Sequence, residues 1–136
     1  MSTVYPPPPT AYSLQLLSHQ TGLSVAVATA GIWYNIGSSI SVPKNGILKI
    51  TIIGHISGGT GSVRIALTRG TTTYYITNFN GITSTASSPV ILTLSTYGAN
   101  IITLEIPVLG GDTLQFQVTN SSNYTVYIDD LTVILQ

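Results

Sequence analysis

The chain has 136 residues, with four Lys or Arg, four Asp or Glu and no Cys, so charged residues make up 6% of it and the formal net charge is zero. A typical soluble domain carries about 25% charged residues. Four scattered basic residues do not form the dense patch that a phosphate backbone requires, and the absence of Cys excludes disulfides and thiolate metal sites. An enzyme must place acids, bases or metal ligands, and few are available here. We therefore expect a structural or binding protein without a cofactor, not an enzyme and not a nucleic-acid-binding protein.

The first 12 residues are distinct from the rest because of their prolines. In order, the segment contains Tyr5, Pro6, Pro7, Pro8, Pro9 and Tyr12. Consecutive prolines cannot donate backbone hydrogen bonds and favour an extended polyproline II conformation. A disordered tail and an arm that docks on a neighbouring subunit are both compatible with this composition. We predict an arm over residues 1–12 that contacts a neighbouring subunit through its prolines and tyrosines, followed by a single domain over residues 13–136.

Targeting and membrane segments are not expected. The N-terminus has neither the basic nor the apolar stretch of a secretory signal peptide, and no run approaches 18 uninterrupted apolar residues. We therefore expect neither a signal peptide nor a membrane span.

From residue 13 onward, apolar and polar residues alternate with a period of two, which is typical of strands with one buried face. In chain order, the alternation covers residues 23–27, 32–36, 46–54, 62–68, 102–106, 114–118 and a last run from about residue 125. Gly, Pro, Asn and Ser interrupt it at residues 43–46, 58–61, 80–81, 98–100, 110–112 and 120–123, as turns require. Residues 83–88 are small and polar and predict a longer surface loop. The pattern indicates an all-β protein, an antiparallel β-sandwich of about eight strands.

The parity of each run predicts which side chains face the core. The inner residues are Leu48, Ile50, Ile52, Val63, Ile65, Leu67, Ile102, Leu104, Ile106, Leu114, Phe116 and Val118. Lys49, Arg64 and Glu105 then point outward, and Glu105 is solvated or pairs with one of the two bases. In the last run the parity changes between Ile128 and Leu131, which predicts a β-bulge near Asp129 and Asp130.

Two segments carry a family resemblance. ISVPKNGILKITIIG, residues 40–54, resembles the strand, proline-containing turn and strand of viral and tumour-necrosis-factor-like jelly rolls. Residues 104–136 resemble their closing strands, in which a Gly-Asp turn precedes an alternating strand and the chain ends in a core strand. The richness in Thr, Ile and Tyr is similar to that of capsid proteins of viruses infecting hyperthermophilic archaea. The resemblance implies a small single jelly roll that forms rings or trimers in a virion, and it implies no catalytic residues.

Few residues are candidates for metal binding or catalysis. Asp112, Asp129 and Asp130 supply the oxygen ligands that Ca²⁺ prefers, but no D-x-D-x-D-G loop is present. The competing interpretation is that Asp112 caps a turn and the other two satisfy backbone groups at a bulge. His19 and His55 are the only imidazoles, and we expect His55 to be exposed at the end of a strand without a catalytic role.

The aromatic residues and two sequons are candidates for binding or modification sites on the surface. Trp33, Tyr34, Tyr74, Tyr75, Phe79 and Tyr97 suit either sugar stacking or a subunit interface. Trp33 and Tyr34 are adjacent on a strand, so they point to opposite faces, and we expect Trp33 at an interface. Asn120 and Asn123 each begin an N-x-[ST] sequon in an expected loop, which makes them candidate glycosylation sites.

These observations favour a capsid or other virion component that binds copies of itself and other structural proteins. A carbohydrate- or receptor-binding head that contacts host surface glycans is one alternative, and an extracellular filament subunit is another. The expected location is the virion, or otherwise the cell surface or extracellular space.

Overall fold

The computed structural model describes residues 14–77, 81–84, 90–96 and 98–136. The predicted arm, Phe79 and Tyr97 therefore lie outside the described residues. The described chain contains ten strands and no helix, so it has no helix long and apolar enough to cross a membrane. The strands are β1 (Gln15–Ala26), β2 (Tyr34–Ser41), β3 (Gly46–Ile56), β4 (Gly61–Arg69), β5 (Thr72–Thr77), β6 (Gly81–Ser84), β7 (Leu92–Leu94), β8 (Asn100–Val108), β9 (Thr113–Asn120) and β10 (Thr125–Leu135).

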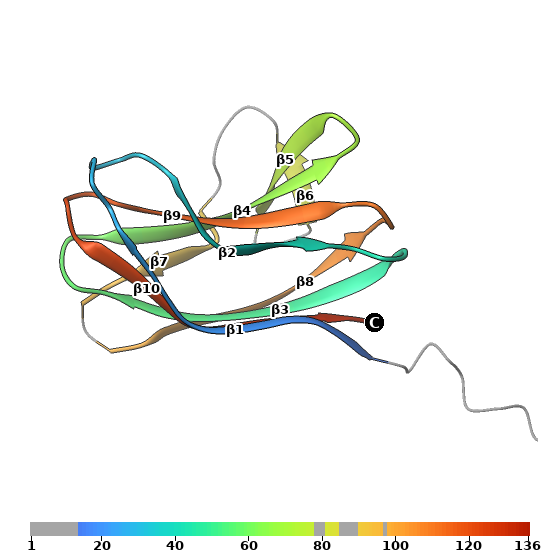
Figure 1. Cartoon of the computed structure of the whole chain (residues 1–136), viewed down its shortest axis with the longest axis horizontal. Helices are drawn as coiled ribbons and strands as arrows, with labels where there is room; N and C mark the ends of the chain where they lie inside the picture. Colours follow the sequence, from blue (N-terminus) through green and yellow to red (C-terminus); the bar gives the residue numbers. More distant parts are fainter. Residues whose placement is uncertain (1–13, 78–80, 85–89, 97) are drawn as a thin grey trace, which may run out of the picture.

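The strands form two antiparallel sheets packed face to face (Figure 1). One sheet has the order β1-β10-β3-β8, and the other has the order β2-β9-β4-β5-β6, with β7 also paired to β4. From β1 to β4, and again from β7 to β10, each connection crosses from one sheet to the other. This is the strand order of a jelly roll, which has eight strands in two Greek keys. The predicted fold class is confirmed, and the hairpin β5–β6 is an addition between β4 and β7.

The predicted surface loop at residues 83–88 is wrong at its first end. Residues 83 and 84 belong to β6, which pairs with β5. Residues 85–89 lie outside the described part of the chain. Short polar strands at a sheet edge need no apolar alternation, because their pairing comes from backbone hydrogen bonds. Side-chain periodicity therefore gave no indication of this strand.

The core lies between the sheets, and the predicted inner residues fill it. All twelve are buried except Ile102 on β8, which is partly buried and packs against the core. Phe116, at 2% exposure, is among the largest buried side chains, and Ile65 and Ile36 lie beside it in register. The period-two parity thus predicted the core correctly.

The predicted bulge is confirmed in β10. The register with β3 shifts between Ile128 and Asp130, so one extra residue, Asp129, is accommodated on β10. Val126 and Ile128 face the core before the bulge, and Leu131 and Val133 face it afterwards. Without the extra residue, one of these two pairs would point to solvent.

The core position of Phe116 predicts a large effect of truncation. Phe116→Ala should reduce the free energy of unfolding by about 3–5 kcal/mol, because it removes buried area and leaves a cavity between tightly packed sheets. Chemical denaturation followed by far-ultraviolet circular dichroism measures this loss. Ser39→Ala, at an exposed position of β2, is the matched control and should change stability by less than about 0.5 kcal/mol. A similar small effect of Phe116→Ala would contradict the packing.

Candidate functional site

The outer face of the β2-β9-β4-β5-β6 sheet carries a cation held between aromatic rings. The Arg64 guanidinium lies 4.3 Å from the ring centroid of Trp33 and 4.5 Å from that of Tyr75. Arg64 Nε donates a hydrogen bond to Gln117 Oε1 at 2.7 Å, and Gln117 Nε2 donates to Asn35 Oδ1 at 2.9 Å. We call these five residues the Arg64 cluster. It combines partly exposed rings with amides that can form further hydrogen bonds.

The exposure of Arg64 differs from the expectation from the sequence. Its side chain points away from the core as predicted, yet it is only 8% exposed because the rings cover it. Burial lowers the pKa of the guanidinium, and the neighbouring Tyr75 partly offsets this effect. Arg64 also lies on the opposite sheet from Glu105, so the two residues do not pair.

The adjacent aromatic residues separate as predicted. Tyr34 packs against the core, and its hydroxyl accepts a hydrogen bond from the Thr29 backbone N–H at 3.0 Å. Trp33 lies on the other side with Arg64. Tyr74 also packs against the core, so among the described aromatic candidates only Trp33 and Tyr75 belong to the outer cluster. The expectation that Trp33 forms a subunit interface stays a prediction.

The outer face of the β1-β10-β3-β8 sheet carries two His–Asp pairs on either side of the bulge. His19 Nε2 on β1 lies 3.1 Å from Asp130 Oδ2, and His55 Nδ1 on β3 lies 2.7 Å from Asp129 Oδ2. The His55 ring also stacks on Tyr127, with centroids 4.5 Å apart and planes at 7°. A hydrogen bond from the Thr132 hydroxyl, and secondarily the contact with His19, lower the pKa of Asp130. The bulge thus ties β10 to both of its neighbours.

These pairs change the interpretation of the two candidate metal ligands at the bulge. Asp129 and Asp130 each bond a different histidine, and within the described residues no group of three His, Cys, Asp or Glu side chains could hold a metal ion. His55 is half-exposed near the end of β3, as expected, but its carboxylate partner was not foreseen. Neither imidazole hydrogen-bonds a serine or threonine hydroxyl in the described chain.

Asp112 caps a turn, as the competing interpretation held. Its carboxylate is 1% exposed and accepts two hydrogen bonds from Arg69, from Nε at 2.9 Å and Nη2 at 2.7 Å. It also accepts one from the Leu109 backbone N–H at 2.9 Å. The hydrogen bonds from Arg69, aided by the one from Leu109, lower the pKa of Asp112 against the opposing effect of burial. Asp112 therefore fixes the β8–β9 turn to the end of β4.

The two sequons occupy different environments. Asn120 is fully buried, with its Nδ2 donating to the Gly58 carbonyl at 2.9 Å and its Oδ1 accepting from the Ser122 N–H. Glycosylation there would require this loop to open, which argues against it in the folded chain. Asn123 is exposed in the same turn and remains a candidate.

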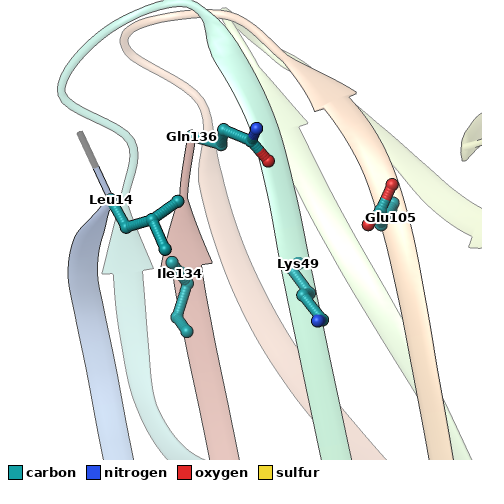
Figure 2. Close-up of a pocket in the computed structure, with 5 residues that line it drawn as sticks. All are labelled: Leu14, Lys49, Glu105, Ile134 and Gln136. Atoms are coloured by element: carbon teal, nitrogen blue, oxygen red, sulfur yellow. The ribbon is translucent and has the colours of Figure 1, made fainter. Parts of the chain in front are cut away.

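A groove of about 320 Å³ crosses the outer face of the four-stranded sheet (Figure 2). Leu14 and Ile134 line one end, Gln136 lies above them, and Lys49 and Glu105 stand side by side at the other end. Lys49 and Glu105 are direct register partners on β3 and β8, but within the described chain no ion pair joins their side chains, and Glu105 is exposed as the first of its two expected alternatives held. Two further exposed apolar side chains lie near the groove on the same face: Leu16, which pairs in register with Ile134, and Ile47 on β3.

Sequence patterns identified the outward side chains but not their partners. His19 and Asp130 are 111 residues apart, and His55 and Asp129 are 74 residues apart. The sequence placed His55 at an exposed strand end and the two aspartates at a bulge, and it gave no facing for His19. Only the strand order shows that β10 lies between the other two strands, and this order brings the histidines to the aspartates.

Comparison with known proteins supports the fold. No family model matches the chain, and no curated protein matches it significantly. Among solved structures, the xylan-binding domain CBM22-1 of Xyn10C from Paenibacillus barcinonensis is 10% identical, with a TM-score of 0.50 over 89% of this chain and 94% of that one. The module TmCBM61, solved with β-1,4-galactotriose, is 12% identical, with a TM-score of 0.50 over 94% and 77%. The C-terminal domain of A223, a structural protein of Sulfolobus turreted icosahedral virus, is 19% identical, with a TM-score of 0.43 over 91% and 99%. At these identities, the two likenesses with a TM-score of 0.50 show the fold alone.

The Asp112–Arg69 pair predicts an acid-sensitive contribution to stability. Because the folded-state pKa of Asp112 is lowered, its contribution is complete above the unfolded-state pKa of about 3.9 and is lost as pH falls through the folded-state pKa. Asp112→Ala should cost about 2 kcal/mol at neutral pH and flatten the decline below about pH 4. Urea denaturation across this range measures both effects. Glu105→Gln, which removes an exposed carboxylate, is the control, and an unchanged acid decline in Asp112→Ala would refute the assignment.

Proposed function

We propose that the chain is a structural component of a virion that assembles through contacts between copies of itself and with other structural proteins. One observation carries the proposal: large apolar side chains gather on the outer face of the four-stranded sheet. Leu14, Leu16 and Ile47, which are 64%, 59% and 45% exposed, lie at one end of this face, and Ile101, which is 62% exposed, lies at the other end, beyond the Lys49–Glu105 and Thr51–Thr103 rows. Exposed apolar side chains that cluster like the first three mark surfaces that subunit contacts bury.

The charge of the surface supports the same proposal. The whole chain has eight charged residues, four of each sign, and two of them, Asp112 and Arg64, are buried and do not contribute to the surface. A surface of hydroxyls, amides and apolar groups with zero net charge gives little repulsion between copies. The compositional resemblance to capsid proteins of archaeal viruses directs the proposal to a virion, because a jelly roll by itself supports many functions.

The predicted N-terminal arm belongs to this proposal. Residues 1–12 precede Leu14, which lines the groove on the apolar face. Prolines reduce the entropy that an extended segment loses when it docks, so such an arm suits contact with a neighbouring copy. Strand donation by β1 is not favoured, because β1 pairs with β10 from Gln15 to Ala26.

Assembly and the arm can be tested together. The full-length chain should form oligomers at micromolar concentration in native mass spectrometry, and deletion of residues 1–12 should weaken them by about tenfold or more while thermal unfolding of the sandwich is unchanged. Removing the docked tyrosines and prolines loses buried area without touching the core. Tyr5→Ser with Tyr12→Ser is a milder companion variant. Assembly that is equally strong after deletion would contradict the arm, and a monomeric full-length chain would contradict self-assembly.

The Arg64 cluster supports a second candidate function, a carbohydrate-binding head. Trp33 and Tyr75 are partly exposed rings, and Gln117 and Asn35 offer amide groups beside them. Rings that stack on sugar faces and amides that bond hydroxyls are the groups a glycan site needs. The two similar modules named above bind xylan and a galactose trisaccharide, which makes these sugars suitable probes.

The glycan candidate predicts a specific loss of binding. If the chain binds xylan or β-1,4-galactotriose in isothermal titration calorimetry, Tyr75→Ala should weaken binding by about tenfold, because a stacking surface is lost. Tyr124→Ala removes a tyrosine that is 45% exposed in the β9–β10 turn and is the matched control. Equal effects of both variants, or no binding of either sugar by the unsubstituted chain, would count against this function.

A further inference from the structure

On the outer face of β3 and β8, the residues that lie opposite each other in register are chemically matched. Lys49 lies opposite Glu105, and the next outward row pairs Thr51 with Thr103, whose hydroxyl oxygens are 3.3 Å apart. Each row therefore holds either two complementary groups or two similar ones. We call this two-strand surface, residues 47–53 and 101–107, the β3–β8 seam.

The rows at the two ends of the seam are apolar. Ile47 lies opposite Pro107 at one end, and Ile53 lies opposite Ile101 at the other. Ile47 and Ile101 are 45% and 62% exposed, so each apolar row reaches solvent. From end to end, the seam is apolar, charged, hydroxyl-bearing and apolar again.

Consider a two-fold axis that runs parallel to the strands, above the outer face and midway between β3 and β8. Rotation about this axis keeps each row at the same height along the strands. Such an axis places β3 of one copy over β8 of the other without sliding either strand along its length. Lys49 then meets Glu105 of the partner copy, and Glu105 meets Lys49 of the partner copy. Threonines meet threonines and apolar residues meet apolar residues. An isologous interface requires this kind of self-complementary surface.

We propose that the β3–β8 seam is a two-fold interface that binds a second copy of this chain. The inference rests on the proposed self-assembly and names the surface that carries it. Charge complementarity argues for this occupant: the seam contains one lysine and one glutamate in a chain with only eight charged residues, and they occupy the same row. Figure 2 shows both side chains standing on the same face, on neighbouring strands, with the groove beside them.

Face-to-face packing suits the geometry of the seam. Aligned sheets pack with their strands within about 30° of each other, which an axis along the strands permits. Four rows on two strands supply the centre of such a contact, with the exposed isoleucines as its apolar ends. The two copies of the Lys49–Glu105 row fix the register, because a shift by one row would bring lysine against threonine.

Charge reversal tests the seam. In K49E both residues of the row are acidic, and in E105K both are basic. A dimer of either variant would therefore contain two repulsive pairs in its interface. Like charges across an interface cost several kcal/mol, so self-association should weaken by about 100-fold or more. K44E is the matched control for K49E, because Lys44 is an exposed lysine in the β2–β3 turn and its reversal changes the net charge by the same amount. Native mass spectrometry and sedimentation velocity measure association, and near-ultraviolet circular dichroism confirms that each variant is folded.

Mixing the two variants separates contacts between chains from contacts within one chain. An acidic copy facing a basic copy restores both attractive pairs, so ¹⁵N-labelled K49E mixed with unlabelled E105K should form a heterodimer that neither forms alone. Restoration by mixing supports the seam. Variants that associate as strongly as the unsubstituted chain overturn the seam but leave self-assembly standing. Variants that dissociate and are not restored by mixing overturn the two-fold arrangement, since the seam then contacts another surface, such as the N-terminal segment. An unsubstituted chain that stays monomeric overturns both the seam and the proposed function.

Discussion

The sandwich depends on how β10 fits between β1 and β3. This strand must present apolar side chains to the core along eleven residues while pairing on both of its edges. The bulge at Asp129 makes this possible, because one additional residue resets the parity between Ile128 and Leu131. The same bulge turns two consecutive aspartates to the outer face, where each bonds a histidine of a different neighbouring strand. The β-bulge therefore sets both the inner packing and the polar contacts of the outer face.

Much of this architecture follows from local sequence patterns. Period-two alternation identified the core residues, and the parity change in the last run located the bulge. The jelly-roll class followed from the number of strands and from the resemblance of residues 40–54 and 104–136. The hairpin β5–β6 was not predicted, because no alternating run was identified over residues 72–77 and residues 83–84 were expected in a loop. Periodicity reports which face of a strand is buried, and it gives a weak signal for strands as short as β5 and β6.

The partners of the polar residues could not be predicted in the same way. Arg64 was expected to point outward into solvent, but Trp33, just before β2, and Tyr75 on β5 cover it. Arg69 and Asp112 are 43 residues apart and meet because β4 pairs with β9. Each contact depends on strand order, and strand order is a property of the whole chain. The two outer faces consequently differ in character: one holds a shielded cation among rings and amides, and the other exposes isoleucines and leucines.

The pairing of β1 with β10 also has a consequence for how the chain reaches this structure. Gln15 pairs with Leu135, and β3 has β10 as one of its two neighbours, so the four-stranded sheet is incomplete until the last strand is available. Contacts between such distant residues require a large loop to close before any energy is gained, which makes folding slow. During synthesis at about 5–20 residues per second, the inner faces of β1 and β3 lack their shared partner until β10 has been made. Unpaired apolar strands of this kind are prone to aggregate, so this interval is the one in which the chain is most exposed to misfolding.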